Sequence, residues 1–546
     1  LLNVQKDSAS NLNLQGDDRF LTKPLLMELL PPLNPNQFDY GFYLEKKGIH
    51  HQVFLEKNQF LKLNSSRNSL YGLSEKFRSH IQTSIEKCDF KKNELAVINA
   101  LLLGQRQDIS KELITDYQRA GAIHILAVSG LHIGIILLLL SYLLKPLERI
   151  KHGKLLKTVL LILLLWMFAF IAGLSASVVR AVTMFTFVAI GMSFKRKNIV
   201  EFSLISSLFF LLLIKPMFLF DVGFQLSYLA VFGIVWVQPK LYSIWNPKYK
   251  LVDFFWQLFT VSIAAQLGIL PLSIFYFQQF PGLFLASNLI IIPLLGTILI
   301  CGVLVIILSV LKILPQIIAD VYGFIISKMN AFVSWISLQE EFLFKEISIS
   351  FWLMISWYLL ILLGVLFFIF KSPKKLLYFL ASILLVQTLF FFEKKENISK
   401  NEFIIFHKSR ISIIGKRKGN ELFLQHSLDS SRVKDDFSLK AYRIAEDIDK
   451  VHQVDFKNYI EFSGKNILII DSLGVYNLKG LKSPIVVLQY SPKINLTRLI
   501  KKIHPSQIIA DGSNYKSYVA RWEKTCLENE IPFYYTGLKA AYILKE

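Results

Sequence analysis

A serine and a histidine lie three residues apart within one strongly apolar stretch of this sequence, residues 121–144. On a helix, side chains at that spacing are neighbours, and Ser129 beside His132 matches the nucleophile and base of many hydrolases. Hydrolysis also needs room for substrate and an oxyanion site, which two side chains stacked on one helix rarely provide. The two residues can instead bond to each other, bond to a facing helix, or line an aqueous path.

The same stretch carries His124 and two glycines, Gly130 and Gly134, spaced four residues apart. Small residues at this spacing let a neighbouring membrane helix approach closely, so helix packing by itself explains the glycine pair. The stretch is long enough to cross a bilayer. A plain anchor has no use for its polar side chains, because polar groups in hydrocarbon need partners inside the protein or in a water-filled lumen.

The composition is that of a polytopic membrane protein. Of the 546 residues, 53% are hydrophobic and only 18% are charged, and the mean hydropathy is +0.45. We attribute the net charge of +21 mainly to cytoplasmic loops, where Lys and Arg collect, rather than to a polyanionic partner. Three widely separated cysteines suggest neither a disulfide framework nor a metal site. The sequence begins with Leu1, so we expect natural N-terminal residues to be missing from it.

About ten membrane spans are predicted, with basic loops between several of them assigned to the cytoplasm. If all ten cross, the N-terminal region and everything after residue 393 are extracytoplasmic. If the segment 316–337 lies flat at the interface, the orientation of the C-terminal part changes. The predicted spans are 123–144, 155–172, 176–194, 200–215, 219–237, 254–277, 283–311, 350–370, 376–392 and, less regular, 316–337.

The chain is predicted to contain four regions, one of which is the membrane domain. Residues 1–65 are β-rich, with apolar alternation at 51–55 and 60–63 and a short helix closing at Gly48. Residues 66–120 have helical spacing of apolar residues and charged opposite faces, which favours amphipathic helices lying on a surface. Residues 121–393 form the membrane domain. Residues 394–546 form a small α/β domain, with short apolar strands at 467–470, 485–488 and 508–510.

Further polar residues and two prolines fall within the predicted spans. Prolines free backbone carbonyls, which are tolerated in a membrane only where protein or water satisfies them, so we expect breaks in two spans. Together these residues predict a bundle with a partly polar interior. They are Arg180, Asp221, Gln225, Gln266, Asn288, Pro271 and Pro293.

Four sequence blocks together carry a resemblance to a known family. His124–Gly134 reads H-I-L-A-V-S-G-L-H-I-G, and it is followed in order by A-G-L-S-A-S-V-V-R-A at 172–181, D-V-G-F-Q-L-S-Y-L-A-V-F-G at 221–233 and Q-L-G-I-L-P-L-S-I-F-Y-F-Q-Q-F-P at 266–281. These blocks resemble the ComEC-type competence proteins, and the likeness extends over nearly the whole chain. It implies an inner-membrane channel that passes one DNA strand to the cytoplasm in natural transformation. Residues 35–65 would be the end of an OB-like domain.

The resemblance also implies where the strand passes and what assists it. Phosphates cannot enter hydrocarbon, so the strand needs a polar or positive route. No G-x-x-x-x-G-K-[ST] phosphate loop is present, so we expect a separate cytoplasmic ATP-driven helicase or translocase, together with an extracytoplasmic DNA-receptor protein. We expect a transport protein without a cofactor. The candidate path or channel residues are His124, Ser129, Gly130, His132, Gly134, Arg180, Asp221, Gln225, Gln266 and Asn288.

The C-terminal domain departs from the family pattern. Many members carry a metallo-β-lactamase-like domain with a His-x-His-x-Asp-His cluster after a strand, whereas here residues 489–495 read Q-Y-S-P-K-I-N. The four histidines of the domain are scattered, and zinc hydrolysis needs several convergent ligands. Residues 511–514, D-G-S-N, read as a turn. We therefore predict a degenerate, metal-free domain of similar fold without nuclease activity.

Two other classes of function remain open at this point. An intramembrane hydrolase would use Ser129 and His132, and the change Ser129→Ala should abolish its activity. A small-solute or lipid transporter would be favoured by an inverted repeat between the two halves of the bundle, and no convincing repeat is visible in the sequence.

Overall fold

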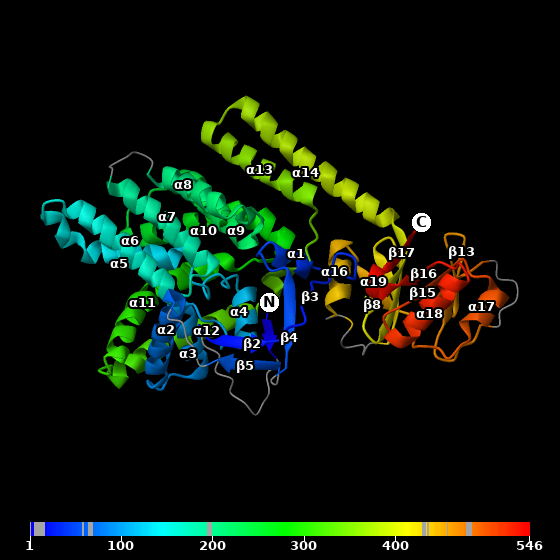
Figure 1. Cartoon of the computed structure of the whole chain (residues 1–546). Helices are drawn as coiled ribbons and strands as arrows, with labels where there is room; N and C mark the ends of the chain where they lie inside the picture. Colours follow the sequence, from blue (N-terminus) through cyan, green and yellow to red (C-terminus); the bar gives the residue numbers. More distant parts are fainter. Residues whose placement is uncertain are drawn as a thin grey trace. The chain divides into compact units, whose positions relative to one another are not determined.

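The computed structural model describes residues 2–4, 17–56, 59–63, 69–193, 199–427, 433, 436–455, 457–476 and 483–546. The chain divides into two units (Figure 1). The first unit consists of Leu1–Met27, His51–Ile347 and Gly364–Lys371, and the second of Glu28–His50, Ser348–Leu363 and Ser372–Glu546.

The first unit is dominated by helices, while α14 and residues 351–363 of α13 belong to the second unit. Seven helices in the described part of the chain are long and apolar enough to cross a membrane: α6, α9, α10, α11, α12, α13 and α14. The helices are α2 (Leu70–Glu86), α3 (Lys92–Leu103), α4 (Lys111–Arg119), α5 (Gly130–Leu143), α6 (Gly153–Ile171), α7 (Ala176–Ser193), α8 (Ile199–Ile214), α9 (Val222–Tyr242), α10 (Lys250–Phe277), α11 (Phe284–Val310), α12 (Gln316–Ser337), α13 (Phe351–Phe370) and α14 (Pro373–Ser399). Short 3-10 helices are η2 (Lys145–Arg149), η3 (Pro216–Phe220) and η4 (Glu340–Phe342).

Most helix boundaries lie within about five residues of the predicted spans, whereas α5 starts seven residues later and α14 ends seven residues later than predicted. The segment 316–337 is the long apolar helix α12. Three apolar helices, α5, α7 and α8, are shorter than the seven candidates. The 14 residues of α5 rise only about 21 Å, less than the roughly 30 Å hydrocarbon thickness. The total of ten spans therefore stays a prediction.

The two prolines do not break their helices, so that prediction is wrong. Helix α10 continues through Pro271 and α11 through Pro293. Close packing supports α10 in this region. A Cβ added to Gly268 of α10 would lie 2.3 Å from the Leu229 carbonyl oxygen of α9, and one added to Gly233 of α9 would lie 2.4 Å from the Ala264 oxygen. The two backbones are therefore in direct contact, and neighbouring protein holds the helix in shape.

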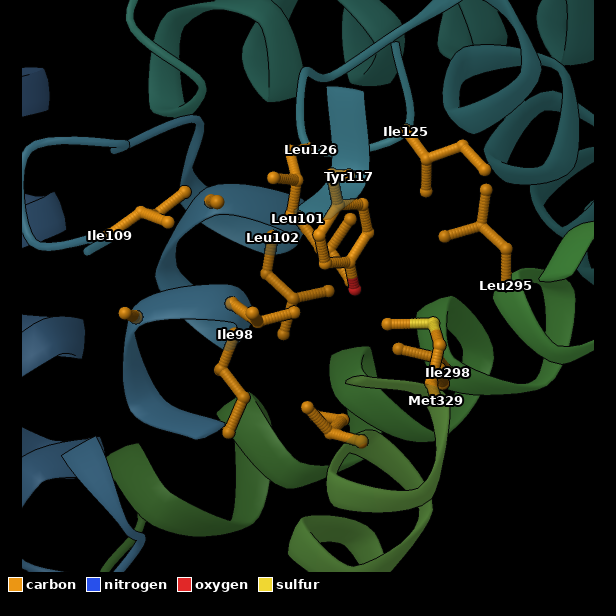
Figure 2. Packing of buried hydrophobic residues seen from close by; sticks show 14 of the residues in the cluster. Ile98, Leu101, Leu102, Ile109, Tyr117, Ile125, Leu126, Leu295, Ile298 and Met329 are labelled. Atoms are coloured by element: carbon orange, nitrogen blue, oxygen red, sulfur yellow. The ribbon is translucent and has the colours of Figure 1, made fainter. Parts of the chain in front are cut away.

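Helix α3 differs from the expected surface helix because it forms the centre of a hydrophobic core. Residues 96–103 are all buried, and Leu101 is 0% exposed. Figure 2 shows Ile98, Leu101 and Leu102 lying across from Leu295 and Ile298 of α11 and Met329 of α12. The charged residues of α3 are confined to its first turn, so its apolar stripe widens into a fully buried surface. The interfacial placement of residues 66–120 as a whole stays a prediction.

The N-terminal strands form two small sheets. A three-stranded sheet has the order β1-β4-β3, and β2 pairs antiparallel with β5. Strands β4 and β5 coincide with the two predicted alternating segments. The OB-like fold of this region stays a prediction. The strands are β1 (Leu2–Val4), β2 (Arg19–Thr22), β3 (Met27–Glu28), β4 (His51–Leu55) and β5 (Phe60–Leu63), and a separate pair within the helical region is β6 (Gln279–Pro281) with β7 (Leu343–Lys345).

The short helix that was predicted to close at Gly48 ends three residues earlier, at Glu45. Helix α1 spans Tyr40–Glu45, because the Asp39 carboxylate accepts a hydrogen bond from the Phe42 backbone N–H at 2.8 Å and caps the helix there. Gly48, where the helix was predicted to close, has a φ of +76° and lies in the turn that follows.

The C-terminal domain contains two five-stranded sheets, in the orders β11-β10-β9-β8-β17 and β12-β13-β14-β15-β16. Strands β13 to β16 are parallel, so their carboxyl ends meet at one edge of the second sheet. The strands are β8 (Asn401–Lys408), β9 (Ile411–Lys418), β10 (Glu421–His426), β11 (Lys450–Gln453), β12 (Tyr459–Phe462), β13 (Lys465–Ile470), β14 (Ile485–Leu488), β15 (Gln507–Ala510), β16 (Phe533–Tyr535) and β17 (Tyr542–Lys545). The helices are α16 (Phe437–Ala445), α17 (Leu496–Ile503), α18 (Lys516–Glu528) and α19 (Thr536–Lys539).

Three hydrophobic clusters define the layers of this domain. Phe403 and Ile405 of the first sheet meet Ile469 and Val487 of the second, so the two sheets pack face to face. Helices α17 and α18 cover the outer face of the second sheet, and α16 covers the outer face of the first. The result is a four-layer α/β/β/α arrangement, in agreement with the predicted α/β class.

A buried arginine ties the end of α14 to this domain. The Arg417 side chain is 0% exposed and donates to the Asn397 carbonyl at the C-terminal end of α14, at 3.3 Å. Its guanidinium also donates to the Glu446 carboxylate at 2.6 Å and to the Gly419 carbonyl at 2.8 Å. Because a buried charge must be paired and fully hydrogen-bonded, these contacts stabilise the junction between the helix and the first sheet.

Candidate functional site

The central stretch of the sequence is helical only in its second half. The predicted span began at residue 123, but α5 begins at Gly130, and residues 121–129 form turns. Gly121 has a φ of +73°, and a Cβ there would lie 2.9 Å from Pro281. Ser177 donates to the Val128 carbonyl at 3.0 Å. These contacts hold a non-helical segment inside the apolar domain, a backbone tolerated at membrane depth only where protein or water satisfies its polar groups.

Ser129 and His132 form the N-terminal cap of α5. The Ser129 backbone N–H donates to His132 Nδ1 at 3.2 Å, and the Ser129 hydroxyl lies 2.9 Å from the same nitrogen. Because Nδ1 accepts, the neutral imidazole carries its proton on Nε2. That Nε2 is buried and has no hydrogen-bond partner among the described residues. The pair therefore caps a helix and leaves one donor unused.

The two glycines of α5 have different surroundings. A Cβ on Gly134 would lie 3.3 Å from the Phe185 ring of α7, so this glycine allows a close helix contact. A Cβ on Gly130 would meet no heavy atom within 4 Å, so the expected packing role is absent there. His124 lies in the preceding turns and is accessible to solvent.

Arg180 and Asp221 are brought together from two different sequence blocks. Arg180 lies in the second turn of α7, is 7% exposed, and places its NH1 atom 3.5 Å from Asp221 Oδ1. Asp221 is the N-cap of α9 and accepts from the Phe224 N–H at 2.7 Å. Gly223 lies beside this pair, since a Cβ there would lie 3.2 Å from Asp221 Oδ1 and 3.4 Å from Arg180 NH2. The arginine thus faces protein rather than the interface, and its Nε atom is buried without a partner in the described structure.

The remaining predicted residues lie on α9, α10 and α11. Gln225 donates to the Leu219 carbonyl at 2.8 Å, while its Oε1 is buried and unpaired within the described ranges. Asn288 of α11 also has a buried Oδ1 without a partner there. Gln266 is half-buried on α10.

Buried unpaired atoms therefore occur on a series of neighbouring helices. Those of His132, Arg180, Gln225 and Asn288 belong to α5, α7, α9 and α11. Helix α5 contacts both α7 and α11, and α7 contacts α9. Buried polar groups in proteins are nearly always hydrogen-bonded, to protein or to water. The interior of this apolar bundle therefore contains polar groups that the described protein atoms do not satisfy.

Within the described helical region, the sequence-based selection missed three residues with the same property. Asn99 of α3, Ser262 of α10 and Arg78 of α2 each have a buried side-chain atom without a partner in the described residues. Arg78 lies beside the turn between α6 and α7, because a Cβ on Gly173 would be 3.0 Å from its NH1 atom. Arg78 sits in a helix with many charged residues, so nothing in its sequence context singled it out.

The C-terminal domain has a separate polar cluster at the carboxyl ends of its parallel strands. Asp511, after β15, is 0% exposed, and its Oδ1 accepts from the Ser513 N–H at 3.0 Å and from Asn514 Nδ2 at 3.0 Å. Burial raises the pKa of the Asp511 carboxyl to about 6, although hydrogen bonds from Ser412 and Ser513 oppose this. Burial lowers the pKa of His407, and the Nδ1 atom of His407 lies 3.0 Å from the Thr536 hydroxyl oxygen.

This cluster does not fit a catalytic metal ion. Zinc hydrolases need three or more convergent His, Cys or carboxylate ligands, and no such group of three exists among the residues that the structure describes. The loop after β14 contributes Gln489, Tyr490 and Ser491 instead.

The fold and these polar groups define a polytopic membrane protein with a partly polar helical interior and a C-terminal α/β domain. A family model described as Competence protein matches residues 101–371, and one described as ComEC C-terminal domain matches residues 403–546. The chain belongs to the ComEC-type family of competence proteins.

One curated relative is ComE operon protein 3 of Bacillus subtilis (strain 168). It is 29% identical to this chain over 259 residues, which cover 47% of this chain and 32% of the relative. The match thus spans about a third of the relative's length. No solved structure matches the chain.

Proposed function

We propose that this protein takes part in competence DNA uptake, and that its helical bundle carries a single DNA strand across the bacterial inner membrane during natural transformation. The observation that carries this proposal is the series of buried unpaired polar atoms on α5, α7, α9 and α11. Membership of a competence protein family supports it.

The physical case rests on the charge of the strand. Phosphates need positive or hydrogen-bonding groups wherever the bilayer would otherwise surround them. The N-terminus of α5 at Gly130 carries backbone N–H groups and the positive end of the helix dipole, and such helix ends are common anion sites in proteins. Arg180 adds a buried positive charge that a single carboxylate, at 3.5 Å, only partly offsets. Gln225 and Asn288 supply further groups for hydrogen bonds.

The orientation and partners belong to the same proposal. With ten crossings, the partial OB-like N-terminal region and residues 394–546 are extracytoplasmic. An extracytoplasmic receptor would deliver DNA, and a cytoplasmic ATP-driven helicase or translocase would draw the strand inward. Fusions of a reporter that is active on only one side of the membrane, placed after Glu546 and after Lys371, test the orientation.

The first test of the DNA path is Arg180→Ala in a transformable host. Labelled DNA should still be captured outside the cell, while the label reaching the cytoplasm should fall at least about tenfold. Arg149→Ala, which removes an exposed arginine of η2, is the matched control and should transform normally. Normal transformation in a strain that lacks the whole gene would refute the proposal.

Substitutions at His132 separate helix capping from contact with the strand. Gln at this position of a capping box can still accept from the backbone N–H of the N-cap residue, but it lacks the imidazole Nε2–H. We expect His132→Gln to insert and fold normally, yet to import less DNA. If His132→Gln imports as wild type does while His132→Ala fails, His132 only caps α5.

An intramembrane hydrolase remains the second candidate because of one specific distance, the 2.9 Å between the Ser129 hydroxyl and His132 Nδ1. Against it, this nitrogen also accepts the Ser129 backbone N–H, and no carboxylate orients the imidazole through Nε2 within the described residues. Ser129→Asn keeps an N-cap acceptor but removes the nucleophile. A channel carrying Ser129→Asn should still import DNA, whereas a hydrolase would be inactive.

For the C-terminal domain we infer a metal-free derivative of the metallo-β-lactamase-like fold, supported by its four layers and by the donor set around Asp511. The full-length protein, reconstituted in lipid, should release no nucleotides from labelled DNA with zinc or manganese added. Cleavage that a chelator abolishes would overturn this inference.

A further inference from the structure

We propose that the loops at the carboxyl ends of β14 and β15 form a surface that binds single-stranded DNA without cutting it. The surface, here called the tyrosine rim, consists of Arg410, Tyr490, Lys493, Tyr515 and Lys516. The identity of the strand as DNA rests on the proposed function. The location and the binding chemistry rest on the C-terminal domain by itself.

Hydrogen bonds join the three segments of the tyrosine rim into one continuous surface. The Tyr490 N–H donates to the Ser513 hydroxyl at 2.8 Å, and the Tyr515 N–H donates to the Ser491 hydroxyl at 2.8 Å. The Arg410 N–H donates to the Gly512 carbonyl at 2.8 Å. The β8–β9 turn and the loops after β14 and β15 are thus neighbours, although up to about a hundred residues separate them in the sequence.

The aromatic side chains of the rim are open to solvent. Tyr515 is 64% exposed and Tyr490 is 37% exposed. The Tyr515 ring is followed by Tyr518 at a centroid distance of 6.5 Å, and the Arg521 guanidinium lies 4.6 Å from the centre of the Tyr518 ring. Exposed aromatic rings that continue into a stacked arginine form a platform on which unpaired bases can stack, whatever their sequence.

The charge of the rim favours a polyanion. Arg410, Lys493 and Lys516 are exposed, and Asp511 is the only carboxyl in the loop residues 409–410, 489–495 and 511–516. Asp511 is 0% exposed, so it presents no negative surface to a ligand. Proteins that bind single strands combine cationic side chains, which contact the phosphates, with aromatic rings, on which the bases stack.

The buried polar cluster explains how the rim keeps its shape. Asn514, which is 6% exposed, accepts from the Ser491 N–H at 2.8 Å and donates to the Leu488 carbonyl at 2.6 Å. Tyr490 and Ser491 have φ values of +56° and +54°, conformations that cost energy unless surrounding contacts hold them. The cluster therefore orders the two loops and directs their tyrosines outward, a structural role that requires no metal.

The test measures binding of a fluorescent oligothymidine to the full-length protein in nanodiscs of zwitterionic lipid. The double variant Tyr515→Ala with Lys516→Ala should bind about fivefold or more weakly, because loss of one stacked base costs at least that factor. For this double variant, the slope of the logarithm of the binding constant against the logarithm of the salt concentration should be shallower by about 0.7. That is the value expected for one lost phosphate contact on a single strand. Tyr515→Phe keeps the stacking face and should bind as the wild type does.

The matched control is Phe437→Ala with Lys440→Ala on α16, which removes one exposed ring and one exposed cation from the outer face of the first sheet. Equal weakening by this control would overturn the proposal. So would competition by duplex DNA as strong as by single strands, or binding to anionic vesicles in place of the oligonucleotide. Arg180→Ala should leave rim binding intact while blocking import, so failure of the channel proposal and failure of the rim proposal give different results.

Discussion

Asp511 should make the C-terminal domain less stable as the pH rises. Its carboxyl is 0% exposed and its pKa is raised to about 6 by burial, from an ordinary value of 3.8. The folded state therefore holds a proton that the unfolded chain has lost, so the free energy of unfolding falls with pH across this interval. The stabilisation is complete below about pH 3.8 and is lost as the pH rises through about 6.

The magnitude follows from the two pKa values. Between about pH 5 and about pH 8, the linkage relation gives a loss of about 1.4 kcal/mol, which is a factor of about ten in the unfolding equilibrium. The change Asp511→Asn keeps the side-chain oxygen that accepts from Ser513 and Asn514 and removes the charge. This variant should lose the pH dependence and be more stable than wild type near pH 8.

Hydrogen exchange of β15 in the full-length protein, corrected for the intrinsic exchange rate at each pH, measures the opening of this domain. His407 acts in the opposite direction, since burial lowers its pKa and the folded state then gains stability as the pH rises. His407 is present in both proteins, so the difference between wild type and Asp511→Asn isolates the aspartate. Asp471→Asn, in the loop after β13, is the control. Parallel pH profiles for wild type and Asp511→Asn would refute the reasoning.

Four substitutions test the packing directly. Gly134→Leu should destabilise the bundle by about 1–3 kcal/mol, because the added side chain meets the Phe185 ring. Gly130→Ala should leave the melting temperature of the detergent-solubilised protein unchanged. Equal effects of the two substitutions would contradict the assigned contact of Gly134. Gly233→Ala should disrupt the contact between α9 and α10 and lower the same melting temperature, and a neutral result would show that the backbones are not in contact. Arg417→Met should cost about 1–3 kcal/mol, because it removes the guanidinium's hydrogen bonds to buried carbonyls and to Glu446, although Lys400 still pairs with Glu446 at 3.2 Å. The loss should appear as faster hydrogen exchange in β8 and β9, and unchanged exchange would contradict the junction described above.

Local pattern was sufficient for the elements whose environment is uniform. Long apolar runs such as α10 and α11 were predicted within a few residues, because hydrocarbon permits little other than a helix. The strands at 485–488 and 507–510 were predicted from short apolar runs that alternate with helical patterns. The family resemblance was also a property of the sequence, since residue order and spacing carry it.

Three features were predicted wrongly because tertiary contacts decided them. The start of α5 moved to Gly130 because the Ser129 cap ends the preceding turns and neighbouring helices hold them. Helix α3 became the centre of a core because α11 and α12 cover its sides. Proline did not break α10, since close packing against α9 supports the helix around Pro271.

The sequence by itself determined the class of protein and the residue types available for a polar path, because hydropathy and spacing are local quantities. The tertiary structure decided which of them meet. Arg180 and Asp221 are 41 positions apart in the sequence and pair at 3.5 Å only because α7 packs against α9. Arg410, Tyr490 and Tyr515 form one surface only because parallel strands end at a common edge. Contacts between distant segments depend on how helices and sheets pack, and no local pattern encodes that packing.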